Sequence, residues 1–214
     1  MRIVEILFET IKTKSFKHLY HVGTLDAGLK RSGSHEGSGL SVSTHPDAWR
    51  EIAPGYVTGD TYIANKPGNK FLDAHSLSKG DKLKIANWGI SQELLVPAET
   101  VRVSWYDDEM EDTMYMDFSS MEEAENEMGS LDDYEIRTQL TGYTATSKLK
   151  KLSNNQQIAP TGIIDFLLPL YAEEAGFDGV WWEDKLDPLR YSAPRGVICV
   201  AKVNTWTFTK ADET

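Results

Sequence analysis

The uneven distribution of negative charge constrains this chain more than any other feature of its sequence. Residues 107–135 contain thirteen Asp and Glu residues and no Lys or Arg, and the formal net charge of the whole chain is −11. The remainder of the chain is therefore close to neutral. Because carboxylates are rarely buried without partners, this segment predicts a solvated acidic unit inserted into an otherwise ordinary domain.

The pattern within the acidic unit predicts a small α+β insertion over residues 100–150. Two alternating runs resemble paired strands joined by an acidic turn. A serine-capped helix with acids in its first turns follows them, and one further strand closes the unit. These elements are expected at 101–106, 114–118, 121–128 and 134–138. The flanking parts, 1–99 and 151–214, are then expected to form a single domain.

The composition limits where the protein can act. With 214 residues, 40% of them hydrophobic, the chain is long enough to bury a core. No run approaches the roughly 18 apolar residues of a membrane span, and residues 2–9 carry acids where a signal peptide is apolar. The net charge also argues against broad attachment to nucleic acid or anionic lipid. We therefore expect a cytoplasmic protein that does not bind membranes.

Short strand patterns fill the two flanking parts. Strands are expected at 19–22, 40–43, 60–65, 70–75, 179–182, 196–203 and 206–208. A Pro-Gly turn between 60–65 and 70–75 predicts that these two form a hairpin. Helices are expected at 46–53 and 161–175, whereas 82–96 fits either a short helix or a strand with a turn at Gly89. Residues 2–9 likewise fit a strand or a short helix.

Cysteine and histidine positions argue against two other kinds of chemistry. Cys199 is the only cysteine, so no intramolecular disulfide can form, and its aliphatic neighbours indicate a core residue rather than a nucleophile. His45, His75 and Asp73 do not have the spacing of a zinc motif. We therefore expect no metal site.

Three segments carry the functional signal. Residues 19–25 read Leu-Tyr-His-Val-Gly-Thr-Leu, 39–44 read Gly-Leu-Ser-Val-Ser-Thr, and 176–183 read Gly-Phe-Asp-Gly-Val-Trp-Trp-Glu. Together they resemble the nucleotide-binding scaffold of the ADP-ribosyltransferase superfamily, in the type that carries histidine on its first strand and occurs among phage and toxin proteins. The resemblance implies an α+β fold with a split mixed or antiparallel sheet and short helices.

The resemblance also implies a site for NAD as co-substrate. In this type of transferase the strand histidine hydrogen-bonds the nicotinamide ribose, and His21 is the matching residue. The glycine that follows holds the carboxamide through its backbone, a role that falls to Gly23 because glycine permits close approach to a planar ligand. Tyr20 and Thr24 flank this pair and are expected to line the nicotinamide pocket.

Further contacts implied by the resemblance come from other strands. Ser41 and Ser43 are expected to line the opposite wall. Since Ser41 stands where the family has a tyrosine that stacks on nicotinamide, Tyr56 or Tyr62 is expected to supply an aromatic surface, and Tyr62 is preferred. Glu183 is the nearest match to the catalytic acid, whose charge stabilises the positive ribose as nicotinamide leaves. Arg195 is expected to contact the pyrophosphate.

Two functions follow from these observations. In the first, the chain transfers ADP-ribose from NAD to a protein or nucleic acid, as a phage or toxin effector in the host cytoplasm would. In the second, it is a non-catalytic binding protein whose acidic face at 107–135 imitates nucleic acid and blocks a nucleic-acid-binding partner. A merely solvated acidic face is a third interpretation of the same residues.

Overall fold

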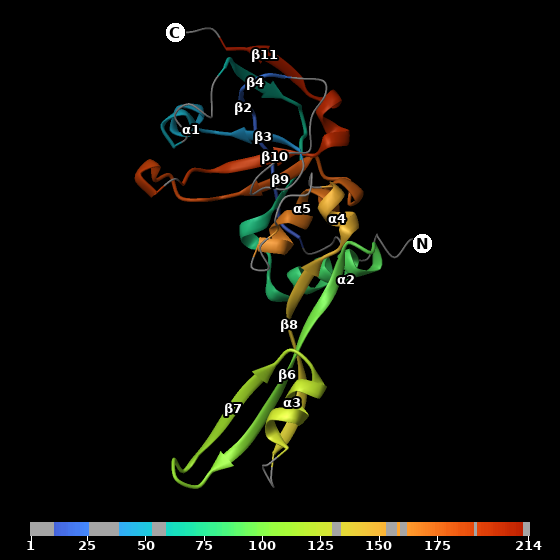
Figure 1. Cartoon of the computed structure of the whole chain (residues 1–214). Coiled ribbons are helices and arrows are strands. Elements are labelled where there is room, and N and C mark those ends of the chain that lie inside the picture. Colours follow the sequence, from blue (N-terminus) through green and yellow to red (C-terminus); the bar gives the residue numbers. More distant parts are fainter. Residues whose placement is uncertain are drawn as a thin grey trace.

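The fold is α+β and is built on two separate sheets (Figure 1). The computed structural model describes residues 11–25, 39–52, 59–129, 134–152, 158, 162–190 and 192–211. A curled mixed sheet of eight strands forms the body, and a three-stranded antiparallel sheet projects from it as an arm. The predicted α+β class is confirmed. The expected element at 2–9 and Tyr56 lie outside the described residues.

The body sheet has the strand order β1-β5-β9-β10-β3-β2-β4-β11. Its strands are antiparallel to their neighbours except β5 and β9, which are parallel. The bounds are β1 Thr13–Lys14, β2 Leu19–Val22, β3 Leu40–Ser43, β4 Thr61–Asn65, β5 Phe71–Asp73, β9 Gly179–Trp182, β10 Arg195–Ile198 and β11 Thr207–Lys210. The three segments that resemble the transferase scaffold therefore contribute β2, β3 and β9 to one sheet.

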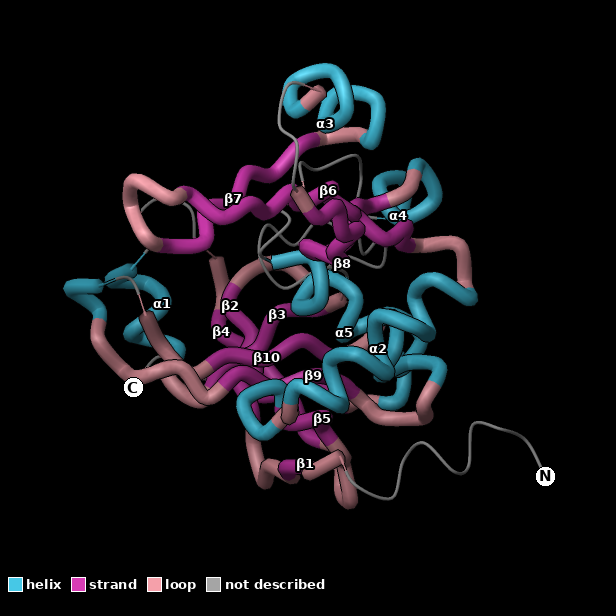
Figure 2. The backbone as a smooth tube through the Cα atoms, turned by 90° about the horizontal axis from the view of Figure 1, so that it is seen from below, coloured by secondary structure: helices cyan, strands magenta, loops and turns pink. Residues whose placement is uncertain are grey.

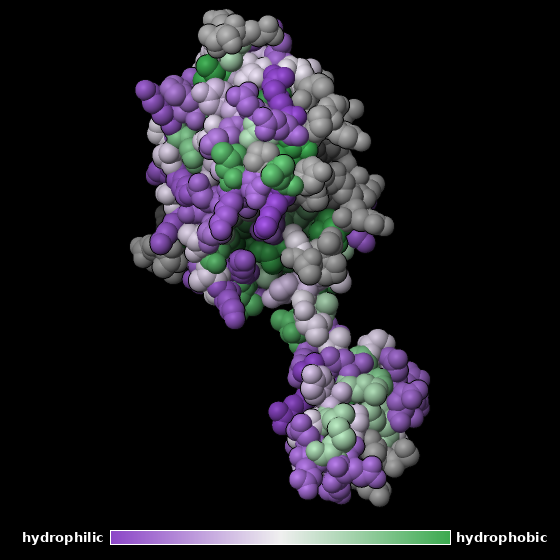
Figure 3. Space-filling view, turned by 90° about the vertical axis from the view of Figure 1, so that its left-hand side faces the viewer, coloured by the Kyte–Doolittle hydropathy of each residue, from purple (hydrophilic) through white to green (hydrophobic). Residues whose placement is uncertain are grey.

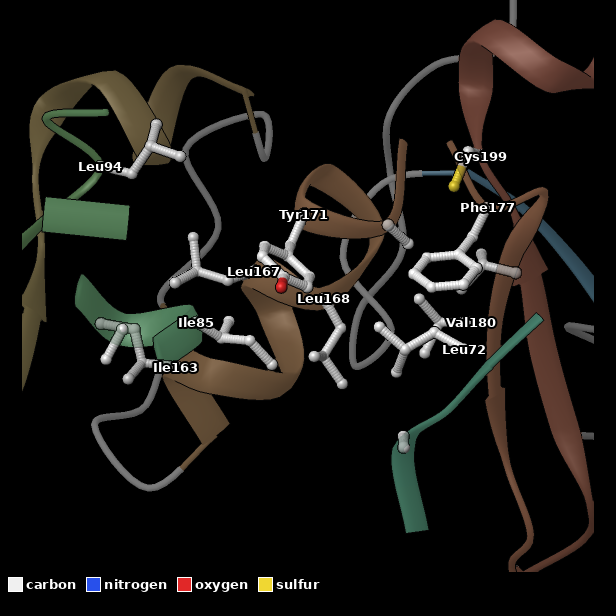
Figure 4. Close-up of a cluster of buried hydrophobic side chains, with 14 of the residues drawn as sticks. Leu72, Ile85, Leu94, Ile163, Leu167, Leu168, Tyr171, Phe177, Val180 and Cys199 are labelled. Carbon is white, nitrogen blue, oxygen red and sulfur yellow. The ribbon is translucent and has the colours of Figure 1, made fainter. Parts of the chain in front are cut away.

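The central strands of the body sheet, β5, β9 and β10, are buried on both faces. On one face, α2 (Lys79–Ser91) and α5 (Ile163–Glu174) lie side by side over the strands (Figure 2). Figure 4 shows the side chains of α5 between those of α2 and those of the sheet. On the other face, Trp181 is fully enclosed with Phe71 and Leu19. Burial of both faces explains why β9 reads as a continuous apolar run rather than an alternating one.

Shorter helices complete the body. They are α1 Pro46–Ile52, α4 Ser147–Leu152 and three 3₁₀ helices, η2 Ala74–Ser76, η4 Pro188–Arg190 and η5 Val200–Thr205. The helix α2 runs through Gly89 instead of turning there. A side chain at Gly89 would place its Cβ 2.8 Å from Leu167 Cδ1, so this glycine allows α2 and α5 to pack closely.

The arm comprises residues 96–144 and has a small core of its own. It contains most of β6 (Leu95–Asp107) and β8 (Glu135–Ala145), together with β7 (Asp112–Phe118) and α3 (Met121–Met128). The predicted strand pair and helix are confirmed. Ser120 caps α3 by accepting a hydrogen bond of 3.1 Å from Glu123 N. The arm core consists of Val101, Val103, Phe118, Ala124 and Met128.

The predicted hairpin of 60–65 with 70–75 is wrong. β4 pairs with β2 and β11, whereas β5 pairs with β1 and β9. The buried side chain of Asn69 explains the difference, because it accepts from Phe16 N at 2.9 Å and donates to Phe16 O at 2.7 Å. These bonds hold the turn against the start of the chain, so the two strands enter different parts of the sheet.

The strand predicted at 196–203 is also shorter than expected. β10 ends at Ile198, and the chain continues from Cys199 into η5. Cys199 is buried, and burial raises the pKa of its thiol to about 12. The thiol therefore stays protonated at neutral pH, as a core residue requires.

No helix in the described part of the chain is both long enough and apolar enough to cross a membrane.

Candidate functional site

The candidate site lies where β2 and β3 meet in the body sheet. β2 pairs with β4 at four positions, and β3 pairs with β10 at four. Between β2 and β3, the described residues pair at one position, Tyr20 with Ser43. One position further along, the ring of His21 reaches across to β3, and its Nδ1 lies 2.8 Å from the carbonyl oxygen of Ser41. The side chain of His21 therefore bonds to β3 at a position where backbone hydrogen bonds would join the two strands in a regular sheet.

The bond to Ser41 determines which nitrogen of His21 carries the proton. A carbonyl oxygen can only accept, so Nδ1 donates, and Nε2 is the acceptor in the neutral ring. Nε2 is buried and has no hydrogen-bond partner among the described residues. A buried polar atom without a partner costs about 1–3 kcal/mol. The arrangement thus presents a fixed acceptor that a ligand hydroxyl or N–H group can satisfy.

Gly23 lies beside this acceptor and has no side chain to contact it. Its φ is +136°, a conformation that L side chains rarely adopt, and a Cβ there would lie 3.3 Å from His21 Nε2. Its N–H donates to Asp60 O at 2.9 Å, which holds the turn in place. Gly59 packs directly against the backbone of Gly23, since a Cβ at Gly59 would lie 3.3 Å from Gly23 Cα. A side chain at Gly23 would therefore crowd Nε2, and Thr24 follows as an exposed residue.

Tyr62 is the aromatic neighbour of His21. The two residues are directly opposite each other in the β2–β4 register, and their ring centroids are 6.5 Å apart at 30°. Both share the sheet face of the buried pair Leu19 and Ala64. Tyr20, one residue before His21, is half-buried and belongs to the opposite face.

The structure does not bring the hydroxyls of Ser41 and Ser43 to the ring of His21. Val42 packs in the cluster of Leu19 and so lies on the same sheet face as His21. Because side chains alternate along a strand, its neighbours Ser41 and Ser43 lie on the opposite face. Ser43 Oγ donates to Pro194 O at 2.7 Å and accepts from His45 N at 2.9 Å. The hydroxyl therefore links the segment after β3 to the segment before β10. Ser41 meets His21 through its backbone carbonyl.

Glu183 lies in a different part of the sheet. It follows β9, which β10 and β3 separate from β2, so three strand spacings place it roughly 14 Å from His21 across the sheet. Its carboxylate forms an ion pair with Lys14 and accepts from Trp181 Nε1 at 3.1 Å. Lys14, and after it the Trp181 N–H, lowers the pKa of the Glu183 carboxyl. Glu183 is therefore a charged but already partnered acid.

Arg195 belongs to a third group of residues, at the start of β10. Its Nε lies 3.3 Å from Asp184 Oδ2, and its guanidinium lies 5.6 Å from the ring centroid of Trp182. Arg195 is opposite Trp182 and Ser43 in the register, so it shares their face and not that of His21. The geometry thus unites His21, Gly23 and Tyr62 but leaves Arg195 apart from them.

Sequence reasoning missed Lys14 as a site residue. Lys14 and Glu183 are 169 positions apart, and β1 and β9 become neighbours only through β5. The one local signal was a small basic cluster at 12–17. No local pattern could have matched that cluster to one particular acid.

Comparisons with known proteins add no further assignment. No protein-family model, curated protein or solved structure matches the chain. Within the described ranges, no group of three or more His, Cys, Asp or Glu side chains could hold a metal ion.

Proposed function

We propose that this chain is an ADP-ribosyltransferase-like protein that binds NAD at the His21 site and transfers ADP-ribose to a macromolecular target. The observation that carries the proposal is the buried, unpartnered Nε2 of His21, whose ring is held in place through Nδ1 and lies beside the backbone of Gly23. The resemblance of three segments to the transferase scaffold supports it, because those segments share one sheet.

The chemistry of the site suits the nicotinamide end of NAD. Nε2 accepts from a ribose hydroxyl, which relieves the cost of a buried acceptor without a partner. The Gly23 backbone allows the flat carboxamide to approach closely. Tyr62 offers an aromatic surface on the same sheet face, and a nicotinamide ring can pack on it in an offset or edge-on manner.

Cleavage requires a negative group near the ribose, because positive charge develops there as nicotinamide leaves. Under the proposal Glu183 supplies that group only after it separates from Lys14 and approaches the ribose bound at His21, roughly 14 Å away across the sheet. The ion pair is partly exposed, with Glu183 49% exposed and Lys14 30%, so its rupture costs little. Binding and cleavage therefore depend on different residues and can be tested separately.

Thermal-shift measurements with millimolar NAD test the binding step. The wild type and a His18→Ala control, which removes an exposed histidine bonded to Asn65, should be stabilised equally. His21→Ala should lose the shift. Absence of any shift in the wild type would contradict the proposal. Nicotinamide release by the wild type but not by Glu183→Gln would then support the cleavage step.

A second function is favoured by the position of Glu183. With its acid partnered by Lys14 and distant from His21, the chain would be a non-catalytic binding protein that captures a nucleic-acid-binding partner through its acidic residues. Stabilisation by NAD distinguishes the two functions, since this second one requires none. Reversal of several charges between 107 and 127 should abolish capture if the acids imitate nucleic acid.

A further inference from the structure

The arm has one sheet face that is covered only in part. The β6–β7 register pairs Val101 with Phe118, Val103 with Met116 and Trp105 with Met114. Directly opposed side chains share a face in an antiparallel sheet, so all six lie on one side, and α3 packs on that side. The core residues Val101, Val103 and Phe118 are buried beneath α3.

Methionines beside the helix and at its first residue remain in contact with solvent. Met114 is 37% exposed, Met116 48% and Met121, at the start of α3, 43%. We call these three residues with the half-buried Trp105 the methionine face. Of the eleven large hydrophobic side chains that are exposed in the described part of the chain, eight lie in the arm. Such a concentration marks an interaction surface more often than chance exposure does.

Two carboxylates lie at one end of the methionine face. Asp107 and Asp112 are paired with each other in the register on the same sheet face, at the tip of the hairpin. Among the described acids of the arm, those in ion pairs with arginine are Asp117 and Glu135. Figure 3 shows pale green apolar residues in the middle of the arm with purple hydrophilic residues around them. The surface is thus apolar at its centre and negative at the end formed by the hairpin tip.

We infer that the methionine face binds a basic amphipathic helix of a partner protein. Methionine is unbranched and polarizable, so a methionine surface adapts to the apolar stripe of a helix. Asp107 and Asp112 complement Lys and Arg beside that stripe and repel acidic helices. A surface that only imitated nucleic acid would need the charges but not the methionines.

Fluorescence anisotropy with a labelled peptide tests this inference on the full chain. The probe is a Leu/Lys peptide of about 18 residues with leucines at i, i+3, i+4 and i+7, and its control has the same composition in scrambled order. The patterned peptide should bind, and the affinity of the scrambled peptide should be lower by about tenfold or more. The inference does not depend on NAD binding, so the test is made without nucleotide.

Matched variants locate the contact. The double substitution Met114→Gln with Met116→Gln should weaken binding about tenfold or more, whereas Leu83→Gln, at an exposed position of α2, should not. Because both methionines are exposed, the double variant is expected to fold. Equal binding of the two peptides, unchanged binding by the double variant, or no binding of either peptide would overturn the inference. If the double variant binds as well as the wild type but binding disappears when the acids are neutralised, the surface is instead purely electrostatic.

Discussion

The body and the arm bury their apolar side chains in different ways. The body buries both faces of its central strands, and the buried polar side chains among its described residues are His21, Ser43, Asn69 and Asp178. The arm buries part of one face behind a single short helix and leaves its charges in water. Precise chemistry is therefore concentrated in the body, where side chains have fixed partners. The arm is suited to contact with a second molecule.

Glycine-to-alanine substitutions should show the largest difference in destabilisation between the body and the arm. A Cβ at Gly179 of the body would lie 2.1 Å from Val197 O and 2.5 Å from Phe71 Cε1, whereas one at Gly142 of the arm would meet nothing within 4 Å. Gly179→Ala should cost about 3 kcal/mol, and Gly142→Ala should stay within about 0.5 kcal/mol. Urea denaturation measures both, and similar costs would remove the packing contrast.

Truncation of the arm core should have a smaller and more local effect. Val103 is fully buried in a core of five residues, so Val103→Ala should cost about 2 kcal/mol. Because the arm has few other buried contacts, this loss should appear as faster hydrogen exchange of its own amides. Amides of β9 and β10 should keep their protection. Uniform acceleration throughout the chain would show that the arm and the body unfold as one unit.

The pH dependence of Glu183 should give a still smaller difference. Lys14 lowers the pKa of its carboxyl, so the ion pair stabilises the fold above the ordinary carboxyl range and stops doing so as pH falls through the lowered pKa. After allowance for its exposure, Glu183→Gln should cost less than about 1 kcal/mol at pH 7. The two proteins should become equally stable near pH 2. A difference that persists there would assign the effect to packing instead.

The exposed ion pair of the arm should contribute least. Glu135 and Arg137 are 68% and 71% exposed, and their closest atoms are 2.7 Å apart. Glu135→Gln should change the free energy of unfolding by less than about 0.5 kcal/mol, and the change should vanish in molar salt. A cost above that of Glu183→Gln would mean that the arm relies on its charges for folding.

Local patterns predicted elements better than they predicted neighbours. Alternation and capping located β2, β3, β7 and α3 because the responsible residues lie within a few positions of each other. The pairing of β4 failed as a prediction because it depends on Asn69 contacting Phe16, 53 positions away. Adjacent elements in sequence are commonly adjacent in space, but here one buried side chain overrides that preference.

In the candidate site, too, local patterns predict the elements but not which residues become neighbours. The sequence places His21, Gly23 and Tyr62 on strands and a turn, yet their grouping comes from the pairing of β2 with β4. Strand alternation directs the hydroxyls of Ser41 and Ser43 away from His21, a consequence that depends on knowing the register. Such relations become visible only once distant segments are paired.

Nitrogen-15 NMR of the histidine rings tests the His21 site most directly. When its ring is neutral, His21 in the free protein should show a protonated Nδ1, as the 2.8 Å contact of Nδ1 with Ser41 O requires, and therefore a bare Nε2. The signals can be assigned by their loss in His21→Gln. Addition of millimolar NAD should shift the Nε2 resonance as it accepts a hydrogen bond, while the Nδ1 proton stays in place. An unchanged Nε2 resonance at that concentration, or a proton already on Nε2 with Nδ1 bare, would contradict the account.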